Sequence, residues 1–80
     1  MYKGDGFMVT FGKILRELRN NSKLTQTELA NSLGLAFSTI SMYERGEREP
    51  DFETLEAIAD YFNVSLDYLL ERTNNPNMQK

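Results

Sequence analysis

The sequence predicts an all-α protein, a compact five-helix bundle that contains a helix-turn-helix. Apolar residues recur at helical spacing in five short segments, and four of these segments begin with Thr, Asp or Ser, which favour helix N-caps. No alternating run of β-branched residues indicates a strand. The 80 residues provide one small domain with a single core.

The first helix is predicted over residues 10–20. Thr10 is its expected N-cap, and Phe11, Ile14 and Leu18 belong to an apolar stripe along one face. Residues 1–9 contain two glycines and no clear period. We therefore expect them to form a flexible N-terminal arm.

Two short helices with a glycine between them follow. Thr25 and Glu28 have the spacing of a capping box, which starts a helix at about residues 26–33. Gly34 stands where a left-handed C-cap is needed. The next helix is predicted over about residues 36–44.

The last two helices are also marked by caps. Pro50 forbids helix just before Asp51, which caps a helix over about residues 52–62. Ser65 caps a fifth helix over about 66–72. The bundle is thus predicted over residues 10–72, followed by a polar tail or linker at 73–80.

The residues of the segment 25–45 match the geometry of a helix-turn-helix. Two helices that cross steeply need a small residue near the crossing, a residue that tolerates positive φ at the turn, and apolar residues that pin the second helix. Ala30, Gly34 and Ile40 meet these needs in that order. The structural residues expected for the motif are Thr25, Glu28, Ala30, Gly34, Ile40 and Glu44.

The charge is unevenly distributed along the chain. The net charge of the chain is −3. Residues 1–45 contain six basic and four acidic residues, whereas residues 46–80 contain three basic and eight acidic residues. Such a chain can turn its less acidic half toward a polyanion, although scattered charge is also common in small domains.

The composition disfavours several classes of function. There is no Cys for a disulfide or a metal, and no His to act as a general base. Carboxylate pairs such as Asp60 with Asp67 have no nucleophile beside them, so we expect no enzyme, cofactor or metal. No apolar run is long enough to cross a membrane and there is no signal peptide, so we expect a cytoplasmic protein without a membrane partner.

Three stretches carry a resemblance to a known family: "LTQTELA", "STIS.YERG..EP" and "LE.IA..F.VSLDYLL". Together they make residues 14–70 similar to the XRE family of helix-turn-helix domains, the phage lambda repressor and Cro type. The resemblance implies a lambda-repressor-like fold and a sequence-specific transcriptional regulator of double-stranded DNA, more often a repressor than an activator. It also implies that the helix at 36–44 enters the major groove.

The resemblance also assigns contacts to individual residues. Those expected to meet base edges are the residues at exposed positions of the third helix and one beside them: Phe37, Ser38, Ser41 and Met42, with Thr39. Those expected to meet phosphates are Gln26, Arg19, Tyr43, Arg45 and Arg48. Three alternatives stay open: a purely structural Arg19–Glu44 ion pair, a core role for Tyr43, and solvated loop charges at Arg45 and Arg48.

Two departures from the family pattern concern the third helix. Ala36 replaces a Ser that often caps this helix, and Phe37 and Met42 replace polar or basic residues. Apolar side chains cannot make bidentate contacts to guanine or adenine but can pack on a thymine methyl group. We therefore expect readout that depends on methyl contacts and DNA shape.

The partners expected from the resemblance are a near-palindromic DNA operator and a second copy of the chain, at least on DNA. A further C-terminal domain or a protein partner is also compatible with it. The residues expected at the dimer interface are Val64, Leu66, Tyr68, Leu69 and Leu70. The alternative function is a protein–protein interaction module, antitoxin-like or anti-repressor-binding, that uses the same helical face.

Overall fold

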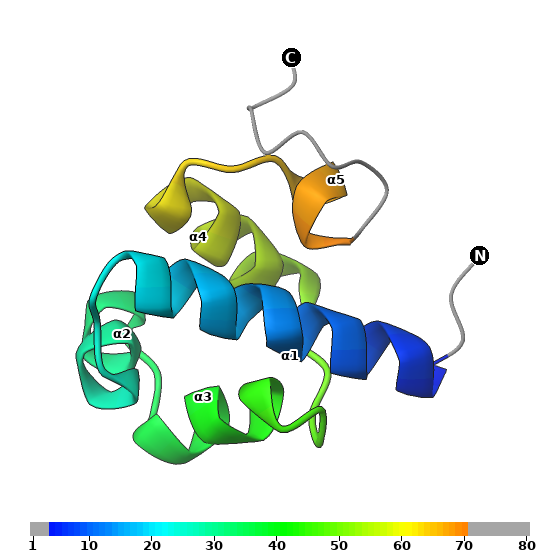
Figure 1. Ribbon diagram of the computed structural model, residues 1–80, viewed down its shortest axis with the longest axis horizontal. Coiled ribbons are helices and arrows are strands. Elements are labelled where there is room, and N and C mark those ends of the chain that lie inside the picture. Colours follow the sequence, from blue (N-terminus) through cyan, green and yellow to red (C-terminus); the bar gives the residue numbers. More distant parts are fainter. Residues whose placement is uncertain (1–3, 71–80) are drawn as a thin grey trace.

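The computed structural model describes residues 4–70 and shows five helices, with no strand among those residues (Figure 1). This confirms the predicted all-α bundle. The helices are α1 (Gly4–Asn21), α2 (Gln26–Leu33), α3 (Phe37–Glu44), α4 (Phe52–Phe62) and α5 (Leu66–Leu69). In the view of Figure 1, α1 crosses the middle of the bundle, with α3 along one side of it and α4 and α5 along the other.

The first helix is longer than predicted. It begins at Gly4, so Thr10 lies inside it and is not its N-cap, and the expected flexible arm is wrong for residues 4–9. Met8 packs against the core, and such tertiary contacts offset the low helix propensity of the two glycines. Residues 1–3, the predicted tail at 73–80 and the predicted end of the fifth helix lie outside the described residues.

The predicted caps of the other helices are confirmed. The Thr25 hydroxyl accepts from the Glu28 N–H at 3.0 Å, and the Thr25 N–H donates to the Glu28 carboxylate at 2.9 Å. Gly34 ends α2 with a φ of 71°, in the left-handed region. Asp51 and Ser65 cap α4 and α5. No side chain caps α3 at Ala36.

One core joins all five helices. Its fully buried large side chains are Phe11, Leu15, Leu29, Ile40, Ile58 and Leu69. The rings of Phe11 and Tyr43 meet edge to face, with centroids 5.8 Å apart. Ala30 and Ile40 are buried, as expected for the crossing of α2 and α3.

A close approach of two backbones at Gly12 was not anticipated from the sequence. A Cβ atom at this position would lie 2.5 Å from the carbonyl oxygen of Tyr43 and 2.9 Å from that of Glu44. Only glycine therefore lets α1 pass this close to the C-terminal end of α3.

Replacing Gly12 with Ala should lower the free energy of unfolding by about 3 kcal/mol, because the new methyl group meets backbone that cannot move aside cheaply. Helix propensity alone predicts the opposite sign, a gain of about 1 kcal/mol. Urea unfolding followed by circular dichroism measures the difference.

Gly34→Ala is the matched control. A Cβ at Gly34 meets nothing within 4 Å, so only the left-handed backbone resists the substitution, at about 1 kcal/mol. A Gly12→Ala protein at least as stable as the wild type would contradict the close approach of α1 and α3.

Candidate nucleic-acid interface

The outer side of α3 is exposed as predicted at its N-terminal end. Phe37, the first residue of the helix, exposes 52% of its surface, and Ser38 is also exposed. Thr39 and Met42 are half-buried. A large aromatic ring at the surface is costly in water unless a partner covers it.

The prediction that Ser41 lies at an exposed position of α3 is wrong. It is only 6% exposed, and its hydroxyl donates to the side-chain oxygen of Gln26 at 2.9 Å. α3 is rotated so that this residue faces the first turn of α2 and not solvent. Ser41 therefore does not belong to the exposed face.

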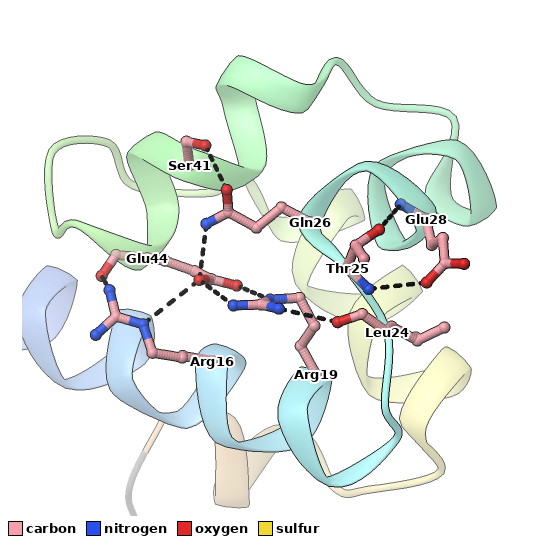
Figure 2. A network of polar contacts seen from close by, with 8 residues as sticks. All are labelled: Arg16, Arg19, Leu24, Thr25, Gln26, Glu28, Ser41 and Glu44. Atoms are coloured by element: carbon pink, nitrogen blue, oxygen red, sulfur yellow. Dashed lines mark hydrogen bonds and ion pairs between the residues drawn. The ribbon is translucent and has the colours of Figure 1, made fainter.

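The inner side of α3 ends in a buried carboxylate, that of Glu44, whose side chain has no exposed surface. Arg19 donates to it from Nε at 2.6 Å and from Nη2 at 3.0 Å. Gln26 Nε2 donates at 2.9 Å, and the longer contact from Arg16 Nε is 3.5 Å. Figure 2 shows these donors converging on Glu44 from α1 and α2.

The network favours the structural alternative for Arg19. Its third nitrogen donates to the carbonyl oxygen of Leu24 at 2.9 Å, and its side chain is only 13% exposed. All three nitrogen atoms of the guanidinium thus bond within the protein, as Figure 2 shows. Arg19 thus holds α1, α3 and the turn before α2 together, and its expected phosphate contact stays a prediction.

Gln26 is engaged inside the fold in the same way. Its amide nitrogen donates to Glu44, and its amide oxygen accepts from Ser41 (Figure 2). Both ends of the amide are therefore oriented by α3. The first residue of α2 thereby links the two helices of the motif, and its expected phosphate contact stays a prediction.

Arg16 is a residue of this site that the sequence analysis missed. It donates from Nη2 to the Glu44 carbonyl oxygen at 3.2 Å, yet 49% of its side chain is exposed. The available signal was its position three residues before Arg19, on the same face of α1. Arg16 is thus a cation at the edge of the network that still reaches solvent.

The donors determine the charge state of Glu44. Burial by itself raises the pKa of its carboxyl, but the hydrogen bonds from Arg19 and Gln26 outweigh that effect and hold the pKa below the usual range of glutamate. The hydrogen bond to Glu44 likewise raises the pKa of Arg19. The pair is therefore ionised at neutral pH.

Tyr43 belongs to the core. It is buried against Phe11, and burial raises the pKa of its hydroxyl, an effect partly offset by a hydrogen bond with Thr54. This supports the alternative of a core role over the expected phosphate contact.

The turn after α3 keeps exposed cations at Arg45 and Arg48. Arg45 Nη2 lies 3.0 Å from a carboxylate oxygen of Glu47, in a pair that is about half exposed on both sides. Exposed pairs of this kind are weak, so Arg45 can exchange its partner for another anion.

The five residues expected at the dimer interface differ in how deeply they are buried. Val64 and Leu69 are buried in the core of the single chain, so the prediction that they meet a second copy is wrong. Leu66, Tyr68 and Leu70 are partly buried against that core and retain exposed surface.

Two further features are absent among residues 4–70. There, no group of three His, Cys, Asp or Glu side chains is placed to hold a metal ion. No helix in that range is long and apolar enough to cross a membrane.

Replacing Glu44 with Gln should lower the free energy of unfolding by about 3 kcal/mol at pH 7, because the buried Arg19 charge loses its partner. The folded protein holds the Glu44 pKa below its unfolded value, so the carboxylate stabilises the fold above the unfolded pKa. That contribution is lost as pH falls through the folded pKa. The difference between wild type and Glu44→Gln should therefore shrink below about pH 4.

Urea unfolding at pH 7 and at acidic pH measures both effects, with Glu47→Gln as the control. Glu47 also pairs with an arginine, but at the surface, so its replacement should leave the unfolding midpoint unchanged. Equal midpoints for Glu44→Gln and Glu47→Gln at pH 7 would rule out a stabilising role for the network.

Comparison with known proteins is consistent with this geometry. The chain is 43% identical over 65 residues to the uncharacterized HTH-type transcriptional regulator YqaE of Bacillus subtilis, covering 81% of this chain and 56% of YqaE. The chain spans about half the length of the curated relatives it matches.

Two solved structures extend the comparison. The restriction-modification controller protein C.AhdI of Aeromonas hydrophila superposes with a TM-score of 0.72 at 34% identity, covering 78% of this chain and 94% of C.AhdI. The P22 c2 repressor in complex with a synthetic operator superposes with a TM-score of 0.73 at 35% identity, covering 79% of this chain and 96% of the repressor chain. The helix-turn-helix family model HTH_3 matches residues 15–69. The chain belongs to this family, the XRE-type helix-turn-helix proteins.

Proposed function

We propose that this chain is a sequence-specific DNA-binding transcriptional regulator that places α3 in the major groove of double-stranded DNA. The observation that supports this most is the division of α3 into two sides. Its inner side is tied to α1 and α2 through Glu44, while Phe37 and Ser38 on its outer side contact nothing that would bury them. A rigid helix with an uncovered outer side fits a groove that admits one helix.

The contacts in this proposal follow from exposure. Phe37, Ser38, Thr39 and Met42 meet base edges. The phosphate contacts come from Arg45 and Arg48 in the turn after α3, and from Arg16 on α1, whose side chains all reach solvent. Arg16 donates to the Glu44 carbonyl oxygen, so these cations gather at the C-terminal end of α3, where they suit a phosphate backbone that borders the groove.

We further propose that the regulator is a repressor and binds as a dimer. The relative solved with an operator is a repressor. α3 has eight residues and is about 12 Å long, so one domain covers only a small part of a helical turn. A two-fold dimer on a near-palindromic operator doubles the contacts, and Leu66, Tyr68 and Leu70 offer the surface for it.

The second candidate is a protein–protein interaction module that uses the same face. The exposed Phe37 and the acidic residues after α3 favour it. The two candidates differ in salt dependence, because only DNA binding releases counterions from a polyanion.

The test is selection from random duplexes at about 50 mM and about 200 mM salt, followed by affinity measurements on the enriched sequence. An enriched near-palindromic site is expected. Replacing both Arg45 and Arg48 with Ala should weaken binding to every duplex and reduce the slope of log K against log salt by about two.

The matched control replaces the same two arginines with Lys, which keeps both charges and should keep most of the slope. A protein that enriches no sequence and shows no salt-dependent duplex binding would contradict the proposed function and favour the protein-partner alternative.

A further inference from the structure

We propose that α3 recognises C5-methyl groups of pyrimidines in the major groove, and that it therefore distinguishes 5-methylcytosine from cytosine as well as thymine from uracil. This inference rests on the proposed function, since it concerns which chemical group on DNA the exposed side of α3 reads. It adds a sensitivity to DNA modification.

The first argument is what α3 has available to meet a base. Its one charged residue, Glu44, has no exposed side-chain surface, and Ile40 and Tyr43 are buried in the core. Ser41 is buried and bonded to Gln26. The side chains that remain at the surface are Phe37, Ser38, Thr39 and Met42.

These four side chains do not include the groups that usually identify purines. Arg and Lys make bidentate contacts to guanine, and Asn and Gln make them to adenine. The nearest amide, that of Gln26, is oriented toward Glu44 and Ser41. The structure therefore provides no bidentate hydrogen bond from α3 or from the first residue of α2.

The second argument is the position of Phe37. N-terminal residues of a recognition helix contact base edges, and Phe37 is the first residue of α3 and is 52% exposed. The major-groove feature that an apolar side chain can bury is the methyl group at C5 of thymine. 5-Methylcytosine carries a methyl group at the same ring position. A side chain that buries the methyl group of thymine therefore also buries that of 5-methylcytosine at the same site.

The experiment starts from the duplex enriched by selection and exchanges single bases in each half-site. Replacing thymine with uracil removes the methyl group and keeps every hydrogen-bonding group. At one or more thymines this should weaken binding about fourfold, the value of one buried methyl group. Where a sensitive thymine is replaced by cytosine, methylating that cytosine at C5 should strengthen binding by a similar factor.

Two phenylalanine variants assign the effect to α3. Phe37→Ala should bind the thymine and uracil duplexes equally. Phe52→Ala is the matched control, because Phe52 is also the first residue of a helix and is 62% exposed, but it lies on α4. Phe52→Ala should keep the full preference for thymine. Circular dichroism verifies that both variants are folded.

The outcomes separate this inference from the proposed function. The protein could bind the selected duplex in a salt-dependent way while each uracil or 5-methylcytosine exchange changes the affinity by less than twofold. That result would overturn methyl recognition and leave the DNA-binding function intact. A methyl preference that survives Phe37→Ala would overturn the assignment to Phe37. Absence of binding to any duplex would overturn both proposals.

Discussion

The ion pair between Glu44 and Arg19 is the contact on which the arrangement of the motif depends. Among residues 8–70, Glu44 is the one acidic or basic residue in the buried set, and its donors come from two other helices. Burying a carboxylate is costly unless strong donors surround it, and bidentate arginine is the strongest that a side chain offers. Removing Arg19 would leave the Glu44 carboxylate without its main charged partner inside the bundle, so the pair favours one arrangement of α1 and α3.

This network also explains how a short helix can expose one side and stay attached to the bundle. An eight-residue helix without a side-chain cap is unstable alone. α3 is held at its C-terminal end by Glu44 and by the close approach at Gly12, and in its middle by Ile40. The polar groups that bind α3 to the bundle all lie on its inner side, and Phe37 and Ser38 on its outer side stay exposed.

The sequence predicted well those features that depend on a few consecutive residues. The capping box at Thr25 and the left-handed Gly34 involve atoms within one helical turn, and both are confirmed. The burial of Ser41 and the inward amide of Gln26 depend on how α3 is rotated against α2, which no local pattern determines. The same holds for the start of α1, where tertiary packing overrides the helix propensity of glycine.

Native-state amide hydrogen exchange tests most directly whether Glu44 holds α3 in place. In the wild type, the amides of Met42 in α3 and of Ile58 in α4 should both exchange only through global unfolding. In Glu44→Gln, the Met42 amide should exchange through a lower-energy opening of α3, while the Ile58 amide still requires global unfolding. If the substitution accelerates both amides equally, Glu44 contributes only to overall stability, and the claim that it positions α3 is wrong.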